Sequence, residues 1–405
     1  MNKTAFPPLN QQIEETTHGL HASPFFDQSS GPLKTVVSPY RICPIGAHID
    51  HQGGPVLGVA IDAYSVLSFA PTNDGQIYLT SNDFAEPISF PAHRIPEKKL
   101  DWARYARGAV AALHQQFPDQ VTNGFVGHIS GRLLGAGLSS SASAGVAYLQ
   151  AIAHVNDLAL RKPELVELDR LIENEYLGLN NGIQDQTTII FAGGSYLIHQ
   201  NTRERIVTEI EHPANINDVA WLVIFSGYTR ELTSSGFNDR VAECWQAAKL
   251  LDPAAKILDD AAEEIFLKKK DSLPPDLQRR AAHFFTERNR VEDGARVWAA
   301  GDFEKFGALM NQSCHSSIHQ YECGSAPLIE LHKIALKTEG ILGSRFSGGG
   351  YGGCLVALAQ NNQAPSAIKS ILAEYKTQYP EKADACNGWI ANGVNGAHIV
   401  DLERE

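Results

Sequence analysis

Three glycines and four serines lie within eleven consecutive residues, 135–145, which read GAGLSSSASAG. An apolar, helix-like run follows directly at 146–153. A small-residue loop that runs into a helix leaves backbone N–H groups unpaired, and the positive end of the helix dipole adds to them. This arrangement suits an anion, most often a phosphate, and the serine hydroxyls could also bind a hard cation such as Mg²⁺. The alternative is a turn whose serines only cap the helix.

A second glycine-rich stretch, GGGYGG, occupies residues 348–353. It matches the Gly-x-Gly-x-x-Gly pattern, but a strand-like run follows at 354–359, where a dinucleotide site needs a helix. The chain also lacks the Gly-x-x-x-x-Gly-Lys-[Ser/Thr] motif of a P-loop. Two interpretations stay open for this stretch, which are a tight hairpin and a backbone that lies flat against another part of the chain.

Polar residues also gather in the glycine-containing segment 41–54. Within eleven residues of it, the chain carries Arg41, His48, Asp50 and His51. Carboxylate and imidazole side chains with fixed geometry suit the hydroxyls of a sugar. A polar loop that satisfies only its own turns is the alternative interpretation.

Glu173 and Asp185 are twelve residues apart, across the end of an expected helix and the turn that follows. They could supply one metal ligand and one base to a single cavity, or they could be surface acids. His315 and His319 share one helical face, but no glutamate follows the first histidine as in a zinc protease helix, so metal binding there is disfavoured.

The composition excludes several classes of protein. With 405 residues and 43% hydrophobic content, we expect a globular protein of two domains. The net charge of −12 argues against nucleic-acid or membrane partners. No signal peptide or run of eighteen apolar residues is present, and the six cysteines never form Cys-x-x-Cys. We therefore expect a cytoplasmic protein with reduced thiols.

Strand-like segments dominate up to residue 131 and lack regular alternation with helices, which favours an α+β fold over a doubly wound sheet. A polar segment in 200–215 indicates a domain boundary, which we set between 1–205 and 206–405. The expected strands are 35–42 with a break at Pro39, 65–70, 76–81, 124–130, 195–198, 220–225, 354–359 and 398–400, with a turn at 73–75 joining the second to the third. The expected helices are 11–20, 101–117, 163–179, much of 238–310, and 364–377.

Taken together, these motifs resemble those of the GHMP kinases and, within them, the galactokinases. Residues 41–54 resemble the galactokinase signature, 135–144 the Gly-x-Gly-Leu-Ser-Ser-Ser-Ala motif, and 343–353 the third motif. Residues 182–186 resemble the catalytic stretch, and 102–105 the segment that packs on adenine. The resemblance implies a two-domain α+β fold, with a ribosomal protein S5 domain 2-like N-terminal domain, a ferredoxin-like C-terminal domain and the active site between them.

The resemblance also implies ATP and Mg²⁺ as ligands and assigns a role to each matching residue. Asp185 would take the proton from the sugar C1 hydroxyl, or only orient it, with Arg41 beside it to favour the ionised carboxylate and shield the transferring phosphoryl group. The residues implied for the nucleotide are Trp102, Gly135, Gly137, Ser139 and Ser140, and those for the metal are Ser141 and Glu173. The residues implied for the substrate are Ala47, His48, Asp50, His51, Gly182, Arg230 and Phe237.

The departures from the galactokinase pattern concern the sugar. Galactokinases have Gly-Glu-His-x-Asp, where the glutamate accepts from the 6-hydroxyl, whereas this chain has Ala47 at that position. Removing the carboxylate would admit a sugar that carries its own carboxylate at C6. Phe237 and His51 stand where galactokinases usually have tyrosines. Residues 41–53 look most like those of the galacturonokinases, and His51 or Arg230 could meet the uronate.

We therefore expect an ATP-dependent kinase that phosphorylates the anomeric hydroxyl of D-galacturonate. A galactokinase with altered contacts at C6 is the first alternative. A non-catalytic sensor of ATP and sugar is the second, and it is disfavoured because such regulators lose residues of the serine loop, which is intact at 139–144. The sequence does not reveal the oligomeric state, and we favour a monomer.

Overall fold

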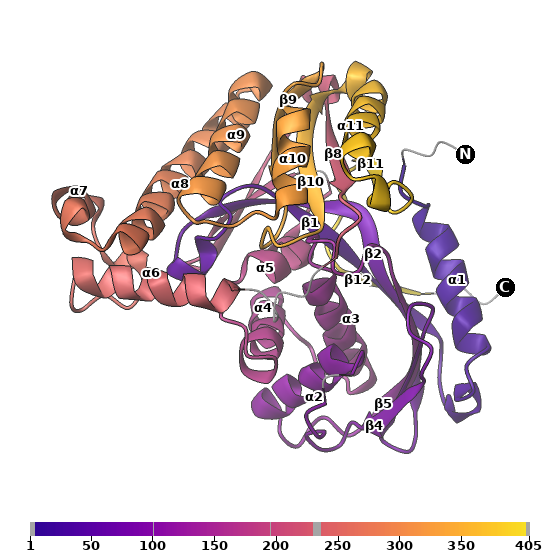
Figure 1. The fold of residues 1–405 in the computed structure, drawn as a ribbon. Helices are drawn as coiled ribbons and strands as arrows, with labels where there is room; N and C mark the ends of the chain where they lie inside the picture. The colour runs from indigo at the N-terminus through magenta and orange to yellow at the C-terminus, as the bar shows by residue number, and fades with distance from the viewer. Residues whose placement is uncertain (1–4, 100, 195, 230–235, 402–405) are drawn as a thin grey trace.

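The computed structural model describes residues 5–99, 101–194, 196–229 and 236–401. Within these ranges the chain forms two sheets with helices packed against them (Figure 1). The mixed α+β architecture expected from the sequence is confirmed.

The first sheet of the described residues has eight strands, six of them in the order β12-β1-β2-β5-β3-β4. In addition, β6 pairs with β2, and β7 pairs with β6. The long strands β1 and β2 are buried along almost their whole length, which requires cover on both faces. Helix α1 packs against β2 and β5, whereas α3 packs against the same strands from the side of α2, α4 and α5 (Figure 1). The strands are β1 (Lys34–Ile45), β2 (Val56–Thr72), β3 (Gln76–Ser81), β4 (Ile88–Pro91), β5 (Gly124–Gly131), β6 (Leu197–Asn201), β7 (Ile206–Ile210) and β12 (His398–Asp401). The helices are α1 (Leu9–His21), α2 (Arg104–Gln116), α3 (Ser140–Val155), α4 (Lys162–Leu171) and α5 (Gln184–Phe191).

The second sheet is antiparallel, with the order β11-β8-β10-β9, and α10 and α11 pack against it. Helix α9 packs on β9 and on α8, and α8 in turn contacts β1 and β2 of the first sheet (Figure 1). The helical layer therefore connects the two sheets. The strands are β8 (Val219–Phe225), β9 (Ile341–Phe346), β10 (Cys354–Gln360) and β11 (Asn387–Ala391). The helices are α6 (Phe237–Leu251), α7 (Glu263–Lys269), α8 (Pro275–Ala299), α9 (Phe303–His319), α10 (Ala326–Ala335) and α11 (Ala364–Gln378).

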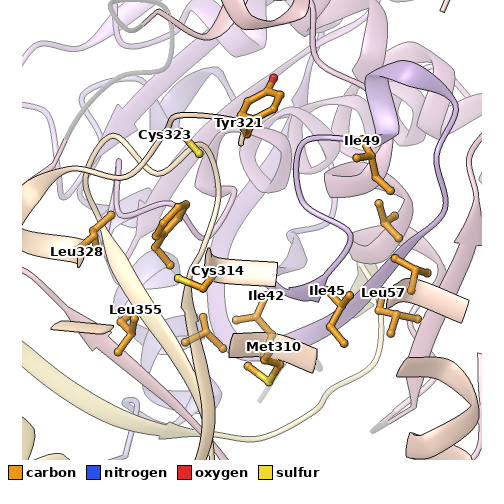
Figure 2. Packing of buried hydrophobic residues seen from close by; sticks show 14 of the residues in the cluster. Ile42, Ile45, Ile49, Leu57, Met310, Cys314, Tyr321, Cys323, Leu328 and Leu355 are labelled. Carbon is orange, nitrogen blue, oxygen red and sulfur yellow. The ribbon is translucent and has the colours of Figure 1, made fainter. Parts of the chain in front are cut away.

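The largest core cluster joins residues that are far apart in the sequence. Figure 2 shows Met310 and Cys314 of α9 beside Ile42 and Ile45 of β1, and all four side chains are buried. Tyr321 belongs to the same cluster and is 1% exposed. This packing fixes α9 and the segment after it against the strand that leads to the 46–54 loop.

Most expected elements are present, but one pairing differs. The turn at 73–75 joins β2 to β3, yet the two strands do not pair, because β5 lies between them. The absence of a side chain at Gly124 allows this arrangement, since a Cβ there would lie 1.9 Å from the carbonyl oxygen of Gln76. The expected break at Pro39 is a register shift within the continuous strand β1.

Further differences concern short elements. The sequence did not predict the strands β4, β7, β9 and β11 or the helices α5 and α10. The expected helix at 163–179 is α4 followed by a π-helical turn, Ile172–Tyr176. The proposed boundary at 205 falls in the turn between β6 and β7, both of which belong to the first sheet, and the division into 1–205 and 206–405 stays a prediction. All six cysteines are free thiols and buried. Among the described residues, no helix is long and apolar enough to cross a membrane.

Candidate active site

The serine-rich loop and the second glycine stretch lie directly against each other. A Cβ on Gly137 would lie 2.7 Å from the carbonyl oxygen of Ser347, and one on Gly353 would lie 2.2 Å from that of Ala136. The Cys354 N–H also donates to the Ala136 carbonyl at 2.9 Å. Both interpretations of the second stretch are therefore correct, because it forms the β9–β10 hairpin and its backbone lies flat on the first loop.

The amino end of α3 is not capped by the serine that precedes it. Ser139 has a left-handed backbone conformation, with φ of 59°, and its side chain makes no capping hydrogen bond to the helix. The purely capping interpretation therefore fails for Ser139. The first N–H groups of this sixteen-residue helix keep the capacity to bind an anion. Gly135 and Ser140 lie at this end, where the Gly135 N–H is 3.4 Å from the Ser140 hydroxyl.

The Ser139 hydroxyl is instead directed at Asp185 in the first turn of α5, and it donates to Oδ2. The other oxygen, Oδ1, accepts from Nε of Arg41 at 2.7 Å. The Arg41 side chain is 4% exposed, and NH1 also donates to the Gly137 carbonyl at 3.0 Å and to Ser347 at 3.2 Å. Arg41 thus joins both glycine loops to Asp185, which itself remains 24% exposed.

Glu173 lies in the π-helical turn and is buried among other acids. Burial and the Asp185 charge raise its pKa to about 7, although hydrogen bonds from Asn181 and Ser141 oppose this. Asp169, one helical turn earlier, is fully buried, and both of its carboxylate oxygens lack a partner among the described residues. The Ser141 hydroxyl and a buried carboxylate short of positive charge fit a Mg²⁺ ion that also binds nucleotide phosphates.

The loop at 46–52 brings the expected sugar residues next to Asp185. Asp50 Oδ2 accepts from the Gln184 N–H at 3.2 Å, and a Cβ on Gly182 would lie 2.4 Å from the same oxygen. Burial and the Asp185 charge raise the pKa of Asp50 to about 6. Asp50, Gly182 and Asp185 therefore lie close together, and their roles toward a sugar stay a prediction.

A cluster of rings surrounds Tyr321, which was not predicted from the sequence. The His48 ring stacks on it with centroids 4.4 Å apart, and His51 Nε2 lies 3.1 Å from its hydroxyl. Phe237 meets His51 edge-on at 5.8 Å. Burial lowers the pKa of His51 to about 3, so its imidazole is neutral and would serve as a hydrogen-bonding group rather than a cation. Arg230, the other candidate for a uronate, lies outside the described residues.

Two side chains of α8 bind the backbone at residues 46 and 47, the second of which is the position where galactokinases have glutamate. Glu287 Oε1 accepts from the Gly46 N–H at 2.7 Å, and His283 Nε2 lies 3.0 Å from the Ala47 carbonyl. Ala47 itself is 5% exposed. The only signal for this pair in the sequence is the four-residue spacing of a histidine and a glutamate on an expected helix, which is too weak to identify it.

Trp102 lies just before α2. Its ring stacks on Phe84 with centroids 5.4 Å apart, and Nε1 donates to the Glu86 carbonyl at 2.8 Å. Its contact with adenine therefore stays a prediction, as do the ligand-binding roles of the other named residues.

Comparisons with known proteins identify the family of the chain. The N-terminal domain of the GHMP kinases matches residues 104–193, and their C-terminal domain matches 296–377. The chain is 40% identical over 387 residues to a galacturonokinase of Arabidopsis thaliana, covering 89% of this chain and 91% of the relative. It is 31% identical over 365 residues to a galactokinase of Staphylococcus saprophyticus, covering 88% and 93%. The chain therefore belongs to the GHMP kinases, in their galactokinase-like branch.

A solved structure agrees at the level of the whole fold. The galactokinase of Lactococcus lactis, complexed with galactose, superposes with a TM-score of 0.84 at 28% identity, covering 91% of this chain and 95% of the other. Membership of this family makes the protein an ATP-dependent kinase with the two-domain GHMP fold.

Proposed function

We propose that the protein transfers the γ-phosphoryl group of ATP to the C1 hydroxyl of D-galacturonate, giving galacturonate 1-phosphate and ADP. The observation that carries the choice of acceptor is Ala47, a buried residue at the galactokinase glutamate position, beside His48 and Asp50. The similarity to a plant galacturonokinase over 89% of the chain supports the same choice.

The chemistry rests on Asp185 and the two groups that hold it. Its carboxylate takes the proton of the sugar hydroxyl as the oxygen attacks the γ-phosphorus in line with the departing ADP. Arg41, 2.7 Å from Oδ1, holds the carboxylate in place and adds positive charge near the transferring group. Ser139 occupies Oδ2 in the free protein, and its hydroxyl turns to the triphosphate when ATP binds, which leaves that oxygen for the sugar.

The nucleotide is held by the loop at 135–141 and the start of α3. Backbone N–H groups there bind the phosphates, with Gly135 and Gly137 allowing their close approach. Ser141 and Glu173 would hold Mg²⁺, which supplies positive charge to the phosphates when bound. Trp102 would contact the adenine.

The sugar lies against the 46–52 loop, with Asp50 and the Gly182 backbone as hydrogen-bonding groups and with His51 and Phe237 beside the ring. Charge at C6 determines the choice of sugar. A glutamate at position 47 would place its carboxylate near that of a uronate, and two such charges 4 Å apart repel by about 4 kcal/mol at an effective dielectric of about 20. Ala47 removes this repulsion together with the acceptor for a neutral 6-hydroxyl.

A galactokinase activity is the second candidate, since one galactokinase is 31% identical to the chain and the solved structure of another shares its fold. A non-catalytic sensor is less well supported, because the Arg41–Asp185 pair and the serine loop are intact.

A substrate panel tests the proposal. The purified protein is supplied with Mg²⁺, ATP and each of a set of hexoses and hexuronic acids, and ADP release and ³¹P spectra of the product are measured. We expect fastest turnover with galacturonate and a phosphate on C1. Preferred turnover of galactose would overturn the choice of acceptor, and absence of sugar-dependent ADP release with every compound would favour the sensor.

A further inference from the structure

A cavity of about 490 Å³ lies between α8, α9 and α10. None of the residues assigned above to the nucleotide or the sugar lines it. Its polar lining includes Arg290 from α8, His315 and Ser316 from α9, and His332 from α10. The volume is sufficient for a phosphorylated metabolite and lies within the range of ligand-binding cavities.

Arg290, which lines this cavity, belongs to a partly buried cluster with an excess of positive charge behind the wall. Arg290 donates from Nε to Glu287 Oε2 at 2.7 Å, and NH1 of the fully buried Arg345 lies 3.7 Å from Oε1. Burial alone would raise the pKa of Glu287, but the charges of Arg290 and other neighbours lower it, so the carboxylate is ionised. Two guanidinium groups thus face one carboxylate, in a protein whose net charge is −12.

Hydrogen-bond donors in the cavity remain available. Arg290 uses Nε for Glu287 and NH2 for Thr286, and the described residues provide no partner for NH1. His332 is 6% exposed, and its Nδ1 lies 2.8 Å from the Ser344 hydroxyl, whereas its Nε2 has no hydrogen-bond partner in the described part of the chain. A guanidinium with a free NH1 binds an oxyanion, and so does a neutral imidazole in the tautomer whose Nδ1 accepts from Ser344 and whose Nε2 carries the proton.

Two chains of hydrogen bonds lead from the cavity to the sugar loop. In the first, Arg290 binds Glu287, which accepts from the Gly46 N–H. In the second, Ser316 lies 2.8 Å from Nδ1 of His283, whose Nε2 reaches the Ala47 carbonyl. Both chains end on the two residues at the position that distinguishes the sugar.

We propose that this cavity binds a phosphate group, either free or as a phosphomonoester, and that its occupation weakens binding of an anionic sugar. The ligand draws the positive charge of Arg290 away from Glu287, which leaves a less compensated carboxylate behind Gly46. A uronate is then repelled more than a neutral hexose. This effect on the sugar rests on the proposed function, whereas binding of the phosphate does not.

Binding is tested by calorimetric titration of inorganic phosphate into protein saturated with Mg²⁺ and a non-hydrolysable ATP analogue, so that the serine loop is filled. We expect one phosphate per chain, bound in the millimolar range. His315→Glu places a negative charge in the cavity on an exposed residue and should weaken binding at least tenfold. The matched control is His319→Glu, one turn further along the same helix and outside the cavity lining, which should change binding less than threefold.

A parallel titration with glycerol phosphate, which lacks a hexose ring, distinguishes an ester from the free ion, and tighter binding of either supports the site. No phosphate binding to the nucleotide-saturated protein, or equal loss in both variants, would overturn it. Kinetics at saturating ATP then test the coupling, for which we expect phosphate to raise KM for galacturonate about threefold in the wild type and not in His315→Glu. If the protein binds phosphate but its KM for galacturonate does not change, the coupling is overturned and the binding site is not. If the protein does not turn over galacturonate at all, the proposed function is contradicted and the binding result still holds.

Discussion

The Ser139 hydroxyl donates to Oδ2 of Asp185 while Arg41 holds Oδ1, so both oxygens of this carboxylate are engaged in the free protein. Ser139 also stands at the start of α3, where the triphosphate is expected, and it makes no capping bond to the helix. One hydroxyl therefore lies between the phosphate site and the catalytic carboxylate. Because the hydroxyl has a single proton, it can donate a hydrogen bond to the triphosphate or to Asp185, but not to both at once.

Replacing Ser139 by alanine should act mainly on kcat, with only a small effect on the stability of the fold. With ATP bound, the variant lacks the hydroxyl contact that positions the triphosphate, and we expect kcat to fall about 10- to 100-fold with the sugar KM little changed. The matched control is Ser143→Ala in the same motif, where the hydroxyl donates only to the Ser38 carbonyl at 2.8 Å. That change should cost about 1 kcal/mol of stability and leave kcat unaltered. Equal kcat in the two variants would contradict the assignment of Ser139.

The Asp185→Asn variant should retain the fold and both ligands but lose turnover. The amide cannot take the proton of the sugar hydroxyl, so kcat should fall about 100- to 10,000-fold. Dissociation constants for ATP and sugar, measured by calorimetry, should stay within a fewfold of the wild type. Turnover near the wild-type rate would show that Asp185 only orients the hydroxyl.

The fold was largely predictable because its elements carry local signals. Hydrophobic periodicity located most of the long helices and strands, but not α5 or α10, and the lack of alternation identified the α+β class. The pairing of β2 with β5 rather than β3 was not predictable, since strand order depends on contacts between distant segments. The short strands β4 and β11 gave too few residues for a clear alternation.

The candidate site was predictable where several motifs in order resembled those of one family. Asp50, Gly182 and Asp185 were expected together and lie together. Tyr321, His283 and Glu287 were not found, because each is a common residue type in a segment without a motif. Only the packing of α8 and α9 against β1 brings them to the 46–52 loop.

Asp50 should reduce the stability of the free protein at neutral pH. Its native pKa is raised from 3.8 to about 6, so the folded state binds the proton more tightly than the unfolded state does. Stability due to this group therefore falls as pH rises from about 4 to 6 and stays reduced above that. Asp50→Asn, which keeps an acceptor for the Gln184 N–H, should gain on the order of 1 to 2 kcal/mol at pH 8 and little at pH 4.

Thermal unfolding of Asp50→Asn and the wild type at the two pH values provides the measurement. Sugar turnover by the variant should be strongly reduced, because the ionised acceptor is lost. A destabilisation at pH 8 would contradict the raised pKa, and the outcome is independent of which sugar is the substrate.

Charge at position 47 should control the choice of sugar. Ala47→Glu should lower kcat/KM for galacturonate about 100- to 1,000-fold. The glutamate carboxylate restores most of the repulsion of about 4 kcal/mol between position 47 and the uronate. Ala47→Gln has nearly the same size without the charge, so it separates steric exclusion from repulsion. We expect the glutamine variant to lose much less activity with galacturonate than the glutamate variant. Equal losses would assign the effect to volume rather than charge.

The most direct test of the central claim is a competition experiment with the wild-type protein. Galacturonate and galactose are supplied at equal concentration in one reaction with Mg²⁺ and ATP, and the two sugar 1-phosphates are quantified by ³¹P spectroscopy at low conversion. Their ratio equals the ratio of the two kcat/KM values. The proposed function predicts a large excess of galacturonate 1-phosphate, whereas equal amounts or an excess of galactose 1-phosphate would contradict it.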